Sequence, residues 1–252
     1  MNIRKTAVAG LFYENDSALL EKELKYIKEN KNNQDAFAII APHAGYLYSG
    51  EVAGEVYKQI REDYNKVIVL APNHTTYTKK AILDENDAWE TPLGQIKLIK
   101  LKTQNTAFEE NKIIHKQEHA IETHIPFLQI KLKNFELLPI IIGDINEVDL
   151  NKIASEIKKI LTDKTLLVIS TDLSHYLTEK HAREEDEETI QKILKLQDVH
   201  PENACGANPL RVLNRILKDT NKKPELIKYD TSAKASRNTR EVVGYVSFII
   251  KN

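Results

Sequence analysis

The stretch Ala36-Phe37-Ala38-Ile39-Ile40-Ala41-Pro42-His43 joins an unbroken apolar run to a proline and a histidine. An apolar run without polar alternation is typical of a strand that is buried on both faces of a sheet. Proline lacks a backbone N–H and disfavours helix for the residue before it, so Ala41 is the predicted end of the strand. The stretch therefore predicts a central strand that places His43 on the loop after it.

Three further apolar runs have the same character, and helical spacing lies between and after them. The runs are Val67–Ala71, Leu137–Ile142 and Leu166–Ile169. Helices are predicted at Ser17–Glu29, Glu51–Arg61, Glu118–Leu132, Val148–Leu161, Ala182–Leu196 and Pro209–Lys218, and closing strands at Leu226–Tyr229 and Val242–Ile250. Asp16, Ser49 and Asn208 are placed to cap three of these helices. The alternation predicts one α/β domain over residues 1–252, with a central, mainly parallel sheet flanked by helices.

Composition excludes several classes of function. Lys and Arg number 36 against 37 Asp and Glu, a net charge of −1, which gives no field to attract nucleic acid. Cys205 is the only cysteine and cannot form an internal disulfide, which fits a reducing, cytoplasmic setting. No apolar run approaches the roughly 20 residues that span a bilayer. We expect neither a nucleic-acid nor a membrane partner, and composition does not address the oligomeric state.

Polar side chains follow each of the four apolar runs. His43 follows the first, His74 follows the second in Pro72-Asn73-His74-Thr75, and Gly143-Asp144 follow the third. Asp172 and His175 follow the fourth. Because ligands of open parallel sheets bind beyond the carboxyl ends of the strands, we expect His43, His74, Asp172 and His175 to converge on one site.

Histidine and carboxylate together indicate a transition metal. Two histidines and a carboxylate suit non-haem iron(II), whereas a thiolate favours zinc or copper. Cys205 lies shortly before the helix predicted at Pro209, where the partial positive charge of a helix start lowers a thiol pKa. Cys205 is therefore a candidate third ligand, although a lone cysteine is more often a small buried apolar residue. Asp172 is the alternative third ligand.

The segment Gln117–Phe127 carries two more glutamates and two more histidines, but it is not a His-Glu-x-x-His zinc motif. On a helix, Glu118 and Glu122 would share a face, with His119 beside them. We interpret Glu118 and His119 as residues that support the ligands or contact the substrate. Tyr46, in the loop after His43, is a candidate for the same role. The remaining polar-flanked histidines are predicted on the surface: His115, His181 and His200.

Six motifs occur in an order that resembles the Memo family, also called AmmeMemoRadiSam system protein B. The motifs are Pro42–Gly50, Pro72–Thr75, Thr91–Gly94, Glu118–Glu122, Ser170–Tyr176 and Ala204–Gly206. The resemblance extends from Ala7 to Tyr245 and implies a fold like that of class III extradiol dioxygenases. It further implies that His43 and His74 are metal ligands, that His175 is the acid/base group and that Cys205 replaces the carboxylate ligand. His124 stands where Memo-like chains commonly have glutamine, and its role stays open.

The resemblance leads us to expect a metal-dependent redox protein. One metal ion, iron or copper before zinc, would bind to His43, His74 and Cys205, and Asp172 and His175 would move protons for a small-molecule substrate. Memo-like proteins are described as copper- or iron-binding redox proteins, and an animal one as an adaptor for phosphotyrosine peptides. Two alternatives are a non-catalytic module that binds a peptide or small ligand in the same cleft, and a metal-assisted hydrolase. The chain offers no arginine cluster of the kind that phosphotyrosine needs.

Overall fold

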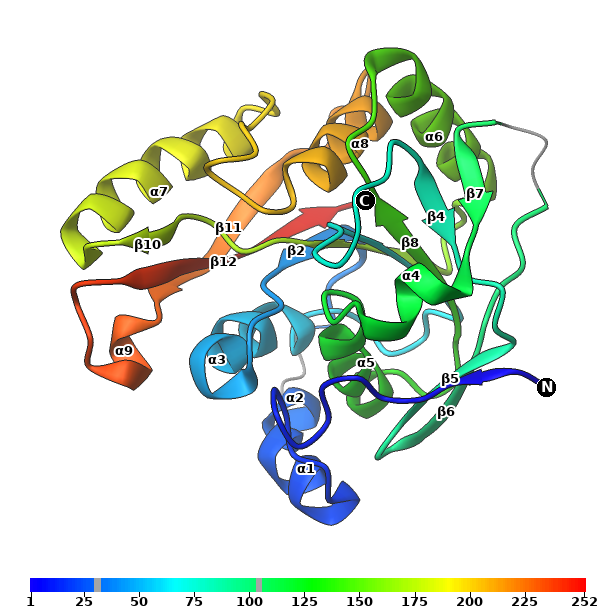
Figure 1. The fold of residues 1–252 in the computed structure, drawn as a ribbon, viewed down its shortest axis with the longest axis horizontal. Helices are drawn as coiled ribbons and strands as arrows, with labels where there is room; N and C mark the ends of the chain where they lie inside the picture. Colours follow the sequence, from blue (N-terminus) through cyan, green and yellow to red (C-terminus); the bar gives the residue numbers. More distant parts are fainter. Residues whose placement is uncertain (30–32, 103–105) are drawn as a thin grey trace.

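The computed structural model describes residues 1–29, 33–102 and 106–252, and a large sheet with helices on both faces forms its centre (Figure 1). Four neighbouring strands run parallel, in the order β2 (Ala36–Ala41), β9 (Thr165–Ser170), β3 (Lys66–Ala71) and β8 (Glu136–Ile142). Their bounds match the four apolar runs to within one residue. The predicted α/β class, with a central, mainly parallel sheet flanked by helices, is confirmed.

Further strands extend both edges of the sheet. At one edge, β12 (Val242–Lys251) runs antiparallel to β2 and also pairs with β10 (His175–Leu177) and β11 (Pro224–Thr231). At the other edge, β4 (Ala81–Leu83) runs antiparallel to β8, and β7 (Phe108–Glu110) runs parallel to β4. A separate small sheet consists of β1 (Ile3–Arg4), β5 (Ala88–Thr91) and β6 (Gly94–Lys97). The shortest strands were not predicted, because two to four residues are too few to show a periodicity in the sequence.

Helices cover both faces of the large sheet, as Figure 1 shows. One face carries α1 (Ser17–Leu24), α2 (Tyr26–Glu29), α3 (Tyr46–Tyr57) and α5 (Ile125–Lys131), and the other carries α6 (Glu147–Ile160), α7 (Glu179–Leu194) and α8 (Ala207–Leu217). The short helices are α4 (Lys112–Gln117), η1 (Glu122–His124) and α9 (Ala233–Ser236). Successive β2 residues enter opposite cores, Ile39 on the α3 face and Ile40 on the α8 face. No helix in the described ranges is long and apolar enough to cross a membrane.

Of the three predicted helix caps, one is confirmed. The Asp16 carboxylate accepts hydrogen bonds from two backbone N–H groups in the first turn of α1. The other two are wrong, because α3 begins three residues before Ser49 and α8 begins one residue before Asn208. Ser49 instead donates to the Ala44 carbonyl, and Asn208 donates to the Gly143 carbonyl. A glycine occupies the cap position of both helices.

The predicted helix Glu118–Leu132 is wrong in its first half. Glu118 has an extended backbone, and the chain turns through η1 before α5 begins at Ile125. Pro126 lies in the first turn of α5. A backbone N–H in this turn has no intrahelical acceptor, so a proline there costs the helix no hydrogen bond. Glu118 and Glu122 consequently do not share a helix face. The loop directs their carboxylates to different partners.

Candidate metal centre

The loops after β2 and β3 bring two histidines together with a third from the segment before η1. The ring centroids of His43 and His74 lie 5.2 Å apart, and the His119 ring lies 5.5 Å from His43 and 4.8 Å from His74. One ring nitrogen of each histidine lies within 4.8 Å of the other two. His119 was predicted only as a supporting residue, because it follows no predicted strand. Two signals in the sequence pointed to His119, namely its place beside Glu118 and its membership of the motif Glu118–Glu122.

The tautomer of His43 follows from its hydrogen bonds. Its Nδ1 lies 2.7 Å from the Ser170 hydroxyl, which donates its only proton to the Ala120 carbonyl at 2.7 Å. Ser170 must therefore accept from an Nδ1–H group, which leaves the lone pair of His43 on Nε2. Burial lowers the pKa of His43 well below its usual range, and the neighbouring histidines lower it further. His43 is thus a neutral imidazole whose Nε2 can bind a metal ion.

His74 is oriented by Glu118. The Glu118 Oε1 atom lies 3.0 Å from His74 Nδ1, and Oε2 accepts the His74 backbone N–H at 2.6 Å. Burial lowers the pKa of His74, but the hydrogen bond and charge of Glu118 outweigh burial and raise the pKa overall. A carboxylate on Nδ1 leaves Nε2 as the metal-binding atom of the neutral ring. Glu118 therefore orients His74 through both of its carboxylate oxygens.

His119 shares the same carboxylate. Its Nδ1 lies 3.5 Å from Glu118 Oε1, and the ring of Phe12 meets the His119 ring edge-on with centroids 4.9 Å apart. Burial lowers the pKa of His119, although the charge of Glu118 opposes the shift. A lowered pKa favours the neutral imidazole that a metal ion requires. One buried glutamate thus supports two of the three histidines.

Cys205 and Asp172 lie next to the free nitrogen of His43. The Cys205 Sγ atom is 3.5 Å from His43 Nε2, and Asp172 Oδ2 is 3.9 Å from the same nitrogen. The Asp172 backbone N–H donates to Cys205 Sγ at 3.2 Å, and Asp172 Oδ1 accepts the His43 backbone N–H at 2.9 Å. Both candidate third ligands therefore adjoin the atom that a metal ion would use.

Gly206 allows Cys205 to approach the end of β9. A Cβ at position 206 would lie 2.4 Å from the Ser170 carbonyl oxygen, so only glycine lets the chain pass this closely. The Gly206 N–H also donates to the Thr171 hydroxyl at 2.9 Å. The expected lowering of the thiol pKa by α8 is wrong, because burial raises the pKa of Cys205 well above its usual range. A metal ion bound at Cys205 would have to displace the thiol proton.

Asp172 and His175 are the remaining titratable groups predicted for the site. Burial raises the pKa of Asp172 to about 7, although the His43 N–H hydrogen bond lowers it. His175 is half-buried at the start of β10, and burial lowers its pKa, with the charge of His74 lowering it further. Asp172 is in contact with His43, and His175 lies close enough for its pKa to respond to His74. A group whose pKa lies near neutrality can both take and return a proton at physiological pH.

Tyr46 does not direct its hydroxyl to the histidines. The hydroxyl donates to the Thr123 carbonyl at 2.7 Å, and the ring packs against Phe127 at 4.7 Å between centroids. Tyr46 therefore ties α3 to the segment before α5.

The surface positions predicted for His181 and His200 are confirmed, because both side chains are exposed.

The two other histidines outside the centre are core residues. The surface position predicted for His115 is wrong, since its ring is fully buried and packs edge-on against Trp89 at 5.8 Å. The local charges around His115 suggested exposure, but neighbouring elements cover the side chain. His124 is also fully buried, with its Nδ1 2.9 Å from the Tyr57 hydroxyl. Burial lowers the pKa of His124 to about 3, so the role left open by the sequence is that of a neutral core histidine.

A buried ion pair anchors the segment that carries Glu118 and His119. Arg4, 3% exposed, bonds to Glu122 Oε2 at 2.7 Å and to the Glu118 carbonyl at 2.8 Å, and its guanidinium lies 4.0 Å from the Trp89 ring centroid. Glu122 also accepts hydrogen bonds from two N-terminal backbone N–H groups and from the Tyr13 hydroxyl. The role of Arg4 was not predicted, because a single arginine near the N-terminus belongs to no motif and to no periodic pattern.

The grouped side chains fit a transition-metal ion. Three imidazoles, a thiol and a carboxyl group are the donor types that bind iron, copper and zinc in proteins. The supporting hydrogen bonds on two histidines are those that orient metal ligands. The cluster is therefore compatible with a metal ion, and its donor types do not select one metal.

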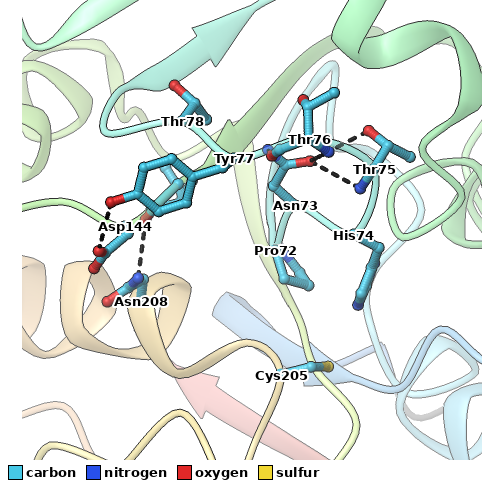
Figure 2. A pocket seen from close by; sticks show the side chains of 12 residues that line it. Pro72, Asn73, His74, Thr75, Thr76, Tyr77, Thr78, Asp144, Cys205 and Asn208 are labelled. Atoms are coloured by element: carbon cyan, nitrogen blue, oxygen red, sulfur yellow. Dashed lines mark hydrogen bonds between the residues drawn. The ribbon is translucent and has the colours of Figure 1, made fainter.

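A cavity of about 410 Å³ opens beside His74 and Cys205. Figure 2 shows these two side chains at one end and Tyr77, Asp144 and Asn208 at the other. The cavity lies beyond the carboxyl ends of the parallel strands, where open α/β sheets bind their ligands.

Comparison with known proteins gives matches along nearly the whole chain. The family described as "Memo-like protein" matches residues 4–249. The chain is also similar to three proteins named "MEMO1 family protein". They come from Methanosarcina acetivorans (33% identical, over 100% of both chains), Aquifex aeolicus (34%, over 99% of both chains) and Sulfurisphaera tokodaii (32%, over 97% of this chain and 98% of the relative). A solved structure of an uncharacterized protein from Escherichia coli K12 aligns with a TM-score of 0.49 and 9% identity, over 85% of this chain and 99% of that one.

Proposed function

The chain belongs to the Memo-like protein family, and we propose that it is a metal-dependent redox protein that acts on a small molecule. The observation that carries the proposal is the group of histidines whose ring nitrogens lie within 4.8 Å of one another. The proposed ligands are His43, His74 and Cys205, with His119 as the further imidazole within reach. This assignment is supported by the two Nε2 atoms that hydrogen bonding leaves free for a metal ion.

Iron or copper is the proposed metal, and either would supply electron transfer and oxygen activation when bound. A Cys205 thiolate with two imidazoles would favour copper, whereas Asp172 in place of the thiolate would favour iron(II).

The protein's own groups would bind the substrate and move its protons. Asp172, whose pKa burial raises to about 7, would accept or return a proton at its carboxylate. His175 would exchange a proton through its imidazole. The cavity beside His74 would hold the part of the substrate that does not react.

Metal content and redox activity test the proposal together. Protein purified anaerobically, without chelators or a metal-affinity tag, should contain iron or copper by elemental analysis. Supplied with oxygen and a panel of phenolic and thiol compounds, it should consume oxygen or change the redox state of its metal. Zinc as the only bound metal, without redox activity, would overturn the proposal in favour of metal-assisted hydrolysis. Binding of a peptide or small ligand in the cleft without any metal would favour a non-catalytic module.

Replacement of Cys205 should change metal preference. Cys205→Ser should weaken copper binding more than iron(II) binding, by at least about ten-fold, because an alcohol replaces a soft thiolate. Cys205→Glu should shift preference toward iron(II), since it restores two histidines and a carboxylate. Competition titrations with chelators of known affinity measure both effects. Equal affinities in the wild type and both variants would remove Cys205 from the ligand set and leave Asp172 as the third ligand.

A further inference from the structure

The cavity beside the metal centre has two chemically different ends. His74 and Cys205 line the end at the proposed centre, and Tyr77 and Asp144 line the far end, as Figure 2 shows. Its volume of about 410 Å³ lies within the range of small-molecule pockets. A small molecule that reacts at the metal centre would therefore place the rest of its structure against Tyr77 and Asp144.

The carboxylate of Asp144 at the far end forms no ion pair with any residue that the structure describes. Among the described residues that line the cavity, none is a lysine or an arginine. Arg211 contacts the lining residue Asn208 through a hydrogen bond from its guanidinium to Asn208 Oδ1 at 2.9 Å. The same guanidinium pairs with the Glu147 carboxylate, which compensates its charge. A negatively charged substrate would be repelled by Asp144, and a positively charged one would be attracted.

The surrounding backbone holds Asp144 in a defined position. Its N–H donates to the Thr78 carbonyl at 2.8 Å, and the Gly143 N–H donates to the Lys80 carbonyl at 3.0 Å. A Cβ at position 143 would lie 2.2 Å from the Thr78 carbonyl oxygen. Glycine is therefore required where the loop after β8, which carries Gly143 and Asp144, approaches the loop after β3, which carries Thr78. The Asp144 carboxylate is therefore placed by main-chain contacts on both loops.

Tyr77 completes a site for a cation. Its hydroxyl donates to Asp144 Oδ2 at 3.2 Å, and within the described part of the chain Asp144 Oδ1 has no hydrogen-bond partner. The Tyr77 side chain is 74% exposed, so a face of its ring is accessible. A carboxylate oxygen and the face of a tyrosine ring are both groups that attract an ammonium ion.

We propose that the far end of the cavity binds a positively charged amine of the small-molecule substrate, with the ammonium group at Asp144 Oδ1 and the ring of Tyr77. The proposal deepens the proposed function, on which it rests for the reaction at the His74 end. It assigns the substrate class, an amine-bearing small molecule, and it gives Asp144 and Tyr77 the role of specificity determinants.

Three phenols that differ in the charge of one substituent test the proposal. Tyramine carries an ammonium group, 4-ethylphenol is neutral and 3-(4-hydroxyphenyl)propionate carries a carboxylate. Calorimetric titration of chelator-treated and of metal-loaded protein should give the tightest binding for tyramine and the weakest for the propionate. Asp144→Asn should weaken tyramine binding on the order of five-fold, the size expected for a partly exposed charge pair with a cation–π contact, and should leave 4-ethylphenol unchanged. The control variant Asp163→Asn, an exposed aspartate before the amino end of β9, should bind all three compounds like the wild type.

The outcomes separate this inference from the proposed function. Equal affinity for the three phenols, or a tyramine preference that survives Asp144→Asn, would overturn the amine site whatever metal the protein holds. A tyramine preference that depends on Asp144 in protein unable to bind iron or copper would support the amine site and refute the redox proposal. Tyr77→Phe, which removes only the hydroxyl that holds Asp144, should give a smaller loss of tyramine binding than Asp144→Asn.

Discussion

His43→Ala and His74→Ala should each abolish tight metal binding while leaving the fold intact. In both rings a hydrogen bond on Nδ1 leaves Nε2 free to bind a metal ion. The partner of His43 is Ser170, and the partner of His74 is Glu118. Loss of a ligand should reduce metal affinity by roughly 100-fold or more, since loss of a supporting partner alone costs about 10- to 100-fold. His74 is partly exposed, and His43, although buried, lies on a loop beyond a strand end and outside the two apolar clusters that pack the sheet against its helices. Metal content after dialysis, with circular dichroism and thermal unfolding, measures both effects.

Two further variants make the histidine prediction specific. His181→Ala removes an exposed histidine of α7 and should retain the metal content of the wild type. Ser170→Ala removes the acceptor that fixes the His43 tautomer and should weaken metal binding by an intermediate amount. Wild-type metal affinity in His43→Ala and His74→Ala, or loss of folding in both, would contradict the site.

Arg4→Met should lower the free energy of unfolding by ~3–5 kcal/mol, because it leaves the Glu122 carboxylate buried without its cation. The Glu118 carbonyl would also lose its hydrogen bond from the guanidinium. Urea unfolding at neutral pH measures the change. Lys5→Met is the matched control, since Lys5 pairs with Glu90 at the surface and its loss should cost less than ~1 kcal/mol.

A double variant separates the charge from the packing around Arg4. Arg4→Met combined with Glu122→Gln should recover part of the lost stability, because no uncompensated charge then lies in the core. The same destabilisation in Arg4→Met and Lys5→Met would show that the buried pair has no special role. Since Arg4 also holds the Glu118 carbonyl, Arg4→Met should weaken metal binding as well, and Lys5→Met should not.

The sequence by itself determined the four parallel strands at the centre of the sheet and the two strand ends that carry His43 and His74. Four apolar runs predicted the parallel strands to within one residue, because a strand buried on both faces needs apolar side chains at every position. Proline after Ala41 and Ala71 marked the strand ends that carry His43 and His74. These signals are local, so they can be recognised without knowing what packs against them.

The tertiary structure alone decided which side chains surround the strand-end histidines and which are buried. His119 joins them because Glu118 binds His74 across 44 residues of chain, and the polar-flanked His115 is buried against Trp89. Arg4 reaches Glu122 across 118 residues, and burial rather than the start of α8 sets the pKa of Cys205. Burial and hydrogen-bond partners depend on segments that are distant in sequence, and the local residue pattern does not encode them.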